Sequence, residues 1–278
     1  MTPKRVILSA DDFGLSEGVN EAVEQAFRSG MLSTASLMVA GPAAADAVRR
    51  ARQLPGLRVG LHLVVIEGAA IGPASSLTDA QRQFPSGQLR LGIDYFFRTN
   101  VRRELAAEIR AQFAAFAATG LRLDHANAHK HMHMHPTVGR LMLAIGGEYG
   151  LPAIRIPAEP PAVMLKCGVV PSLGDRLLYT GTRVLRAQAR RAGVKFNDYA
   201  FGIAWSGHMT ADRIVRLATQ LPAGLSEIYF HPASRRNTQL AGLMPNYEHE
   251  AELATLLDPK VRAALAQAGA VQTSYDAA

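Results

Sequence analysis

A histidine-rich segment, residues 123–136 (LDHANAHKHMHMHP), concentrates residues that can do chemistry. It holds five of the chain's nine histidines, at positions 125, 129, 131, 133 and 135. Alternate residues of an extended strand share one face, whereas a two-residue step on a helix turns a side chain by about 200° and scatters the imidazoles. The spacing therefore predicts a strand that carries His125 and His129 inward and His131 and His133 over its carboxyl end. A surface histidine run, or core histidines with ordinary hydrogen bonds, is the alternative.

Imidazole is a frequent metal ligand, and such a site usually needs a carboxylate. Asp11 and Asp12 supply two carboxylates, directly after the predicted buried strand at residues 5–10. Neighbouring strand residues face opposite ways, so both can aim at one centre only where the strand ends, and Phe13-Gly14 provides that break. One carboxylate can then bind a cation while the other acts as general base on a metal-bound water. An acid pair that caps the following helix is the alternative.

His62 lies in a third apolar segment, VGLHLV, and a histidine in a buried strand must find a partner. Taken by itself, it is more often a hydrogen-bonded core residue than a ligand. With Asp12 and His129 it completes a set of one carboxylate and two imidazoles, which leaves positions open for water and substrate. This donor set favours zinc or a similar transition metal over calcium, and magnesium and manganese stay open.

Two further polar residues end predicted strands. His231, in EIYFHPA, can protonate a leaving group from across the site. Arg155, in AIRIP, can orient a carboxylate or a neighbouring acid, and a surface salt bridge is an equal alternative. Arg155 is therefore a candidate for substrate binding, together with His131 and His133 at the rim.

Short apolar segments alternate with longer helical patterns along the chain. The predicted strands are residues 5–10, 33–40, 58–64, 123–129, 153–157, 198–204, 226–231 and 271–275. The predicted helices are residues 16–30, 43–54, 100–120, 137–149, 210–220 and most of 247–268. Such alternation predicts an α/β fold with parallel strands and outer helices, and seven or eight units favour a TIM-like (β/α) barrel, regular or distorted. Barrel enzymes keep their chemistry at the carboxyl ends of the strands, where these polar residues fall.

We expect residues 1–278 to form one domain with two insertions, at about 65–99 and 158–197. The first lacks periodicity and contains several Gly, Pro and Ser, and long loops in compact domains are usually functional. The second holds a basic helical stretch at 173–191. Residues 165–191 combine apolar side chains with arginines, which fits either a lid that approaches a membrane or an ordinary packed amphipathic helix.

The composition limits the possible partners. The chain has 278 residues, of which 48% are hydrophobic, and a net charge of +7. This charge suits nucleic acid, an anionic membrane or an acidic small molecule. We expect no nucleic-acid partner, because no motif for one is recognisable. One cysteine, Cys167, excludes an intrachain disulfide and a thiolate zinc cage. The amino-terminal segment fits neither a signal peptide nor a membrane span, so we expect a cytoplasmic protein.

Four short motifs follow one another along the whole chain: ADDFG, GLHL, an H-x-H-x-H-x-x-P run and a late HP. In this combination the chain resembles the YdjC-like carbohydrate deacetylase family. The segments DHANAHKHMHMHP and AWSGHMT make it most similar to the branch associated with hopanoid biosynthesis. Members of the wider family remove acetyl groups from N-acetylglucosamine units of chitooligosaccharides. The branch implies an N-acetylglucosaminyl group on a bacteriohopanepolyol as substrate.

The resemblance implies a role for each matched residue. Asp11 would be the general base, and His231 the acid or transition-state partner. The ligands of a divalent ion, with zinc preferred and magnesium as the alternative, would be Asp12, His62 and His129. Asn127 stands where the family commonly has an aspartate. Asn127 would therefore accept a hydrogen bond from a histidine ligand as a neutral group, where an aspartate would carry a charge. This difference can change which metal is preferred and which tautomer the histidine adopts.

The implied reaction hydrolyses an acetamide on an N-acetylated glycoside or glycolipid. Peripheral contact with the inner membrane and a homodimer are both compatible with the sequence. The alternatives are a soluble chitooligosaccharide deacetylase and a His- and Met-rich metal-binding protein that uses HKHMHMH for copper. The second alternative leaves Asp11, His62 and His231 without a role. A glycosidase fits poorly, because the two carboxyl groups of such an enzyme lie about 5 Å or more apart. Asp11 and Asp12 are adjacent in the sequence.

Overall fold

The computed structural model describes residues 2–277, and a parallel sheet forms its centre. The strands are β1 (Lys4–Phe13), β2 (Thr34–Leu37), β3 (Arg58–Leu63), β4 (Leu123–Ala128), β5 (Ala153–Ile154), β6 (Lys195–Phe196), β7 (Tyr199–Phe201) and β8 (Gly224–Phe230). Their order is β6-β5-β4-β3-β2-β1-β8-β7, and every pair along this path is parallel. Parallel neighbours need a crossover on the outer face, which helices supply. The predicted α/β barrel is confirmed, in a distorted form.

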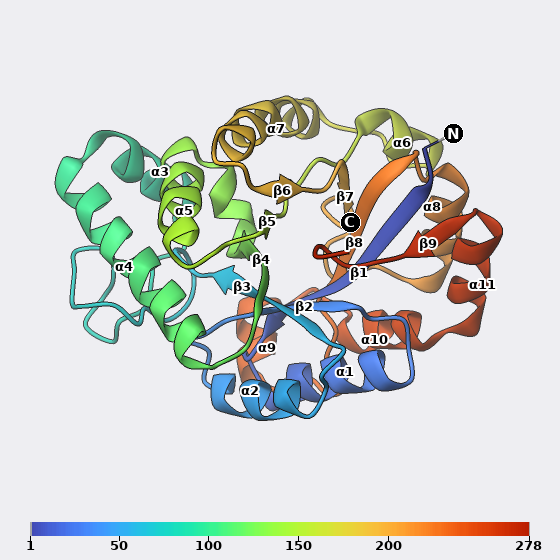
Figure 1. The fold of residues 1–278 in the computed structure, drawn as a ribbon, viewed down its shortest axis with the longest axis horizontal. Coiled ribbons are helices and arrows are strands. Elements are labelled where there is room, and N and C mark those ends of the chain that lie inside the picture. Colours follow the sequence, from blue (N-terminus) through green and yellow to red (C-terminus); the bar gives the residue numbers. More distant parts are fainter. Residues whose placement is uncertain (1, 278) are drawn as a thin grey trace.

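Helices surround the strands as a ring in Figure 1. The longer ones are α1 (Glu17–Arg28), α2 (Ala44–Arg52), α4 (Thr99–Ala118), α5 (Pro136–Glu148), α7 (Leu173–Arg191), α8 (Ala211–Gln220), α10 (His249–Leu257) and α11 (Pro259–Gln267). A parallel sheet with helices outside is buried on both faces, and all seven residues of β8 are buried accordingly. Polar side chains on such strands must therefore find partners inside the barrel.

The sheet curls until its two end strands, β6 and β7, come close together. They are consecutive in the chain with two residues between them, so their ends lie at most about three Cα steps apart. Asn197 bridges this position: its side chain accepts from Ile156 N at 2.7 Å and donates to Ile156 O and Tyr199 O at 2.8 Å each. Ala200 N also donates to Ala158 O at 3.0 Å. A side chain thus performs much of the pairing that closes the barrel.

The carboxyl-terminal segment covers the amino-terminal end of the barrel. β9 (Ala270–Gln272) pairs with the first residues of β1, beside the part of β1 that pairs with β2. Beyond β9, Tyr275 is buried and stacks on His125 with ring centroids 4.9 Å apart. Gly60 leaves room for this imidazole, because a Cβ there would lie 2.3 Å from the ring. An aromatic residue near the chain's end therefore fills this end of the barrel.

The histidine-rich segment differs from its predicted conformation. β4 ends at Ala128, and the next residues, His129–Met134, form a 3-10 segment. Lys130 and His131 have φ of 49° and 53°, in the left-handed region. Two such residues in succession turn the chain away from the strand direction. The extended register predicted beyond His129 is therefore wrong, and the later histidines do not share one face.

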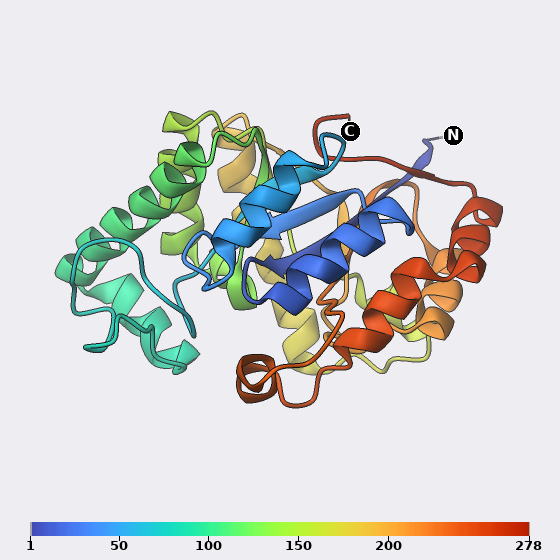
Figure 2. The ribbon, with the colours of Figure 1, turned by 90° about the horizontal axis from the view of Figure 1, so that it is seen from below.

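The predicted insertions contain helices of their own. Residues 65–87 form a loop, which α3 (Gln88–Phe97) follows, and Figure 2 shows this segment in cyan and teal at one end of the fold. Glu108 of α4 anchors the loop by accepting from Ile71 N and Gly72 N at 3.0 and 2.7 Å. The second insertion holds α6 (Pro161–Lys166) and α7. Two of these helices, α3 and α6, were absent from the sequence-based prediction, as was α9 (Thr238–Leu243) in a later connection.

Replacement of Asn197 by Ala is expected to lower the free energy of unfolding by about 2–4 kcal/mol. The change leaves the buried N–H and carbonyl group of Ile156 and the half-buried carbonyl group of Tyr199 without their partner at the closure of the barrel. Urea unfolding measures the loss. Asn100→Ala, at an exposed position of α4, is the matched control and should change stability by at most about 0.5 kcal/mol. Equal stability of the two variants would show that the closure does not depend on Asn197.

Candidate active site

The adjacent aspartates lie at the carboxyl end of β1, where the backbone changes direction. Asp12 has a φ of 62°, and the register of β1 against β2 shifts at this point. Gly14, with a φ of 95°, continues the turn, and its N–H donates to Asn20 Oδ1 of α1 at 2.8 Å. The turn lets neighbouring carboxylates serve one site, since Asp12 contacts His62 and Asp11 lines the same cavity as His62. The break that the sequence placed at Phe13-Gly14 begins at Asp12.

Asp12, His62 and His129 bring their ligand atoms together, as predicted for a metal site. Asp12 Oδ1 lies 3.3 Å from both His62 Nε2 and His129 Nδ1. One ligand atom from each residue lies within 4.8 Å of the others. Within residues 2–277, neither carboxylate oxygen of Asp12 has a hydrogen-bond partner. A buried carboxylate without donors is costly. A divalent cation would satisfy it, so these residues fit a metal ion.

Asn127 fixes the tautomer of His62. Its Oδ1 lies 2.7 Å from His62 Nδ1. An amide oxygen accepts, so Nδ1 carries the proton and Nε2 presents its lone pair toward Asp12. Asn127 Nδ2 donates to Ser36 Oγ at 2.9 Å and to Asp11 Oδ1 at 3.3 Å, which sets the orientation of the amide. The neutral residue therefore orients a ligand, and it acts on His62 rather than on His129.

Asp11 is held by Arg155, which follows β5. The two terminal nitrogens of Arg155 donate to the two Asp11 oxygens at 2.5 and 2.8 Å, a bidentate arrangement. On its other side, Arg155 donates to both oxygens of Glu227 at 2.9 and 2.7 Å. Burial raises the pKa of Asp11, but Arg155 and then His62 outweigh burial and hold the pKa well below its usual range. Asp11 is therefore ionised at physiological pH.

The histidines that follow His129 take different positions. His131 Nε2 lies 3.0 Å from the Tyr229 hydroxyl, and His131 lines the cavity that contains Asp11. His133 Nε2 donates to the Arg155 carbonyl oxygen at 3.0 Å. Both His133 and Arg155 are 0% exposed and lie beneath the cavity, so the substrate contact predicted for them is not seen in the described chain. Burial lowers the pKa of His131 to about 3 and that of His133 well below its usual range, which keeps both rings neutral.

His231 follows β8 and lines the same cavity as Asp11 and His62. Its backbone N–H donates to the Glu252 carboxylate. Its ring packs edge to face against Tyr229 and Tyr247, with centroids 5.7 and 5.1 Å away. These contacts position an imidazole whose Nδ1 is buried and has no hydrogen-bond partner within the described residues.

Burial determines the protonation of His231 and of Glu252, the carboxylate that accepts from the backbone N–H of His231. Burial lowers the pKa of His231, and Asp12 and Asp11 oppose that change only in part. The ring is therefore mostly neutral at pH 7. Burial likewise raises the pKa of Glu252 to about 7, although its carboxylate accepts from the N–H of Met209 at 2.9 Å. A neutral imidazole can donate its N–H to an oxygen that becomes negatively charged.

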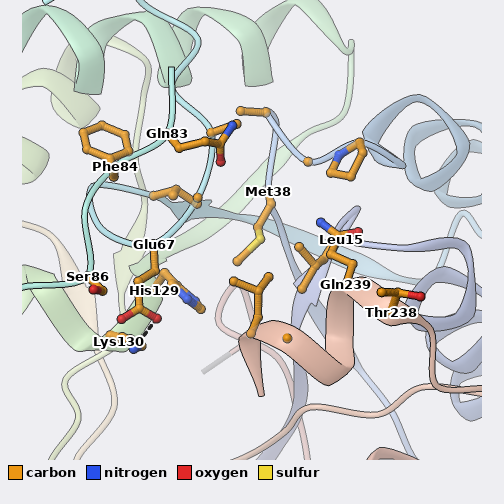
Figure 3. Close-up of a pocket in the computed structure, with 18 residues that line it drawn as sticks. Leu15, Met38, Glu67, Gln83, Phe84, Ser86, His129, Lys130, Thr238 and Gln239 are labelled. Carbon is orange, nitrogen blue, oxygen red and sulfur yellow. Dashed lines mark ion pairs between the residues drawn. The ribbon is translucent and has the colours of Figure 1, made fainter. Parts of the chain in front are cut away.

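Two cavities adjoin at the carboxyl ends of the strands. The smaller, about 300 Å³, is lined by Asp11, His62, His129, His131 and His231. The larger, about 930 Å³, has apolar walls formed by Leu15, Met38, Val64, Phe84 and Leu243. Glu67 and Lys130 line both cavities and form an ion pair, seen beside His129 in Figure 3. A ligand can therefore place a polar part in the smaller cavity and an apolar part in the larger one.

Three residues that complete the site were missing from the sequence-based prediction. Glu227 and Tyr229 lie inside β8, in a segment (SEIYFH) predicted as a buried strand. A charged residue in such a strand is a signal that a partner of opposite charge lies opposite. Glu252 gave no comparable signal, because acidic residues are ordinary in helices. Its burial follows from the packing of α10 under His231.

Comparison with known proteins identifies relatives over the full chain. A family model described as YdjC-like protein matches residues 5–267. The chain is 29% identical over 275 residues to a carbohydrate deacetylase of Geobacillus stearothermophilus, covering 98% of this chain and 97% of that protein. It is 30% identical over 283 aligned positions to a chitooligosaccharide deacetylase of Serratia marcescens, covering 98% of each. A match to a carbohydrate deacetylase of Brevibacillus brevis, at 38% over 154 residues, spans 55% of this chain and 59% of that protein.

A solved structure, a putative cellobiose-phosphate cleavage protein from Enterococcus faecalis V583, shares the fold. The two superpose with a TM-score of 0.76 at 22% identity, over 99% of this chain and 98% of that chain. At this identity the likeness concerns the fold. The family model covers most of the sequence, and a full-length relative is 30% identical. The chain therefore belongs to the YdjC-like protein family.

Proposed function

We propose that the protein is a metal-dependent hydrolase that removes the N-acetyl group from an N-acetylglucosaminyl unit. The observation that carries this proposal is the clustering of Asp12, His62 and His129 beside the cavity that Asp11 and His231 line. The names of the full-length relatives, carbohydrate deacetylase and chitooligosaccharide deacetylase, support amide hydrolysis as the reaction.

Asp12, His62 and His129 would hold the cation. Two imidazoles with one carboxylate favour zinc over magnesium, which prefers oxygen ligands and keeps several waters and is the alternative. A divalent cation bound there would polarise the acetamide carbonyl and lower the pKa of a bound water to near neutrality. His129 is 13% exposed at its side chain, which leaves the ligand set open toward the cavity.

Asp11 is the proposed general base. Arg155 and Asn127 hold its ionised carboxylate in one orientation before substrate arrives. It accepts one proton of the attacking water and passes that proton to the nitrogen as the C–N bond breaks, which gives an amine and acetic acid. The remaining proton of the acetic acid then passes to the amine or to solvent and leaves acetate. Arg155 takes part by positioning Asp11.

His231 is the proposed transition-state partner. Because burial favours its neutral form, its N–H suits an oxygen that gains negative charge during the attack. A protonated His231 that delivers a proton to the nitrogen is the alternative role. His131, held by the Tyr229 hydroxyl in the same cavity, is proposed to contact the sugar.

We propose a sugar with an apolar aglycone, as in a hopanoid glycoside, as the natural substrate. The support is the larger cavity beside the catalytic one, whose walls include Leu15, Met38 and Phe84. Ligand cavities bury apolar groups against such side chains. The same cavity is also lined by polar side chains, those of Gln83, Ser86 and Gln239, which can hydrogen-bond to a sugar. A soluble chitooligosaccharide is therefore the alternative substrate.

Exposed apolar residues support peripheral contact with the inner membrane. On α3, Leu89 and Phe97 are 81% and 72% exposed, and at the start of α7 Leu173 and Leu177 are 73% and 64% exposed. Exposed arginines accompany them in these helices, which suits an anionic lipid surface. The later part of α7 packs inward through Leu185, as expected of an ordinary amphipathic helix. Within residues 2–277, every helix is too short or too polar to cross a bilayer.

Asp11→Asn is expected to lower kcat by about 10²–10⁴-fold while bound zinc is retained, because the change removes the base and keeps the three ligands. Asp12→Asn is the matched neighbour and should lose both zinc and turnover. Acetate release and metal content, measured on the same preparations, separate the two variants. Unchanged turnover in Asp11→Asn, or full zinc content in Asp12→Asn, would contradict the assignment.

Leu243→Glu is expected to raise KM for an N-acetylglucosaminide with a hydrocarbon aglycone by about tenfold, because a charge then faces apolar surface. Leu243 also lines the smaller cavity, so KM for N,N′-diacetylchitobiose should rise as well, but by at most about threefold. Leu243 and Leu257 are 38% and 36% exposed, so Leu257→Glu, outside both cavities, is the matched control. An equal rise for both substrates would favour the chitooligosaccharide alternative.

The double variant Phe97→Asp, Leu177→Asp is expected to lose binding to vesicles of phosphatidylglycerol and phosphatidylcholine. The wild type should cosediment with them, and 0.5 M salt should weaken its binding. Val271→Asp, at a 60% exposed site on β9, is the control and should bind like the wild type. Analytical ultracentrifugation without vesicles tests whether the same residues instead join two copies in a homodimer. Wild-type binding in the double variant would exclude these helices as the membrane contact.

A further inference from the structure

Glu227 is a buried carboxylate inside the barrel with four donors around it. Its Oε1 accepts from Ser9 Oγ at 2.6 Å and from Arg155 Nη2 at 2.7 Å. Its Oε2 accepts from Arg155 Nε at 2.9 Å and from the Tyr275 hydroxyl at 2.6 Å. A carboxylate offers about four acceptor positions, so this group is fully satisfied. Loss of one donor leaves a buried acceptor free to seek another.

Arg155 divides its donors between two carboxylates. It is 0% exposed and bonds both Asp11 and Glu227, so two negative charges share one positive charge away from bulk solvent. Neutral donors must supply the remaining stabilisation. Tyr275 is one such donor to Glu227. Without the Tyr275 hydroxyl, Glu227 would interact more strongly with Arg155. The contact between Arg155 and Asp11 would then change.

Tyr275 reaches this network from the end of the chain. β9 pairs with β1, and Thr273 N continues the contact by donating to Val6 O at 2.9 Å. The Tyr275 ring then stacks on His125 inside the barrel, with the hydroxyl also 3.2 Å from Asn197 Oδ1. The next residue, Asp276, pairs with Arg58 and Arg122 at 3.2 and 3.6 Å. Contacts on both sides of Tyr275 thus set the place of its hydroxyl.

We propose that Tyr275 is a positioning residue for Asp11, acting through Glu227 and Arg155 from the amino-terminal end of the barrel. This inference rests on the proposed role of Asp11 as general base. The tail from Ala270 to Asp276 is then a part of the catalytic apparatus as well as a cover for the barrel. Tyr275 touches no substrate, so its effect falls on the rate of the chemical step rather than on substrate binding.

Tyr275→Phe tests this proposal, because it keeps the ring on His125 and removes the hydroxyl. We expect kcat to fall about tenfold, the effect of one hydrogen bond on a barrier, with KM within about twofold of the wild type. Bound metal should stay at the wild-type level, since Asp12, His62 and His129 are unchanged. An unchanged kcat, or a loss confined to KM, would overturn the proposal.

Asp276→Asn is the control for a loosened tail. It weakens the pairs with Arg58 and Arg122 and leaves the Tyr275 hydroxyl in place. We expect its kcat to match the wild type at temperatures well below the unfolding midpoint. A tenfold loss of kcat in this variant as well would assign the effect to the tail's stability and overturn the positioning role.

A crystal structure of Tyr275→Phe separates this proposal from the proposed function. Displacement of the Asp11 carboxylate from its bidentate contact with Arg155 supports the positioning role, even if the wild type releases no acetate and the deacetylase assignment fails. An Asp11–Arg155 contact identical to the wild type overturns the positioning role, whatever the activity.

Discussion

The interaction on which the site most depends is the buried ion pair of Arg155 with Asp11 and Glu227. It links Arg155, which follows β5, to the neighbouring strands β1 and β8 across the interior of the barrel, although β4, β3 and β2 separate β5 from β1 in the sheet order. Buried charges are tolerated only where partners and hydrogen bonds replace water. Here Ser9, Asn127 and the chain's own tail complete that replacement. The carboxylate proposed as general base is therefore held by Arg155 and Asn127, within a network that extends from Ser9 to Tyr275.

A second constraint is the left-handed backbone at Asp12. A non-glycine residue in this region is strained, and such strain persists where the surroundings hold it and is often found at functional sites. At this point it lets adjacent carboxylates divide two tasks, one toward the imidazoles of His62 and His129 and one toward Arg155. Lys130 and His131 also have left-handed backbone, and they directly follow His129, the potential ligand just beyond the end of β4. Backbone strain and ligand placement coincide on both strands.

Much of this arrangement follows from the sequence, and the remainder depends on contacts across the barrel. Alternating strands and helices predicted the barrel, and the rule that parallel strands end together predicted that Asp12, His62 and His129 would meet. The left-handed residues could not be foreseen, because Asp, Lys and His are common in ordinary conformations. The hydrogen bond between Asn197 and Ile156 forms only because the sheet curves, and the partners of Arg155 are set by the register between the strands. Neither feature can be read from the sequence. Helix α3 was missed because apolar residues such as Leu89 and Phe97 point outward and obscure an amphipathic pattern.

The pairing of β1 with β8 and β9 has a consequence for biosynthesis. The strand that carries both aspartates is synthesised before two of its neighbours, β8 and β9, which follow it by more than 200 residues. At translation rates of about 5–20 residues per second, β1 waits roughly 10–50 s for them. Until then its apolar edge has β2 as a neighbour on one side and stays open on the other, where nascent chains are prone to misassociation. A chaperone that shields this edge during translation would therefore protect the chain while β1 has no partner on that side.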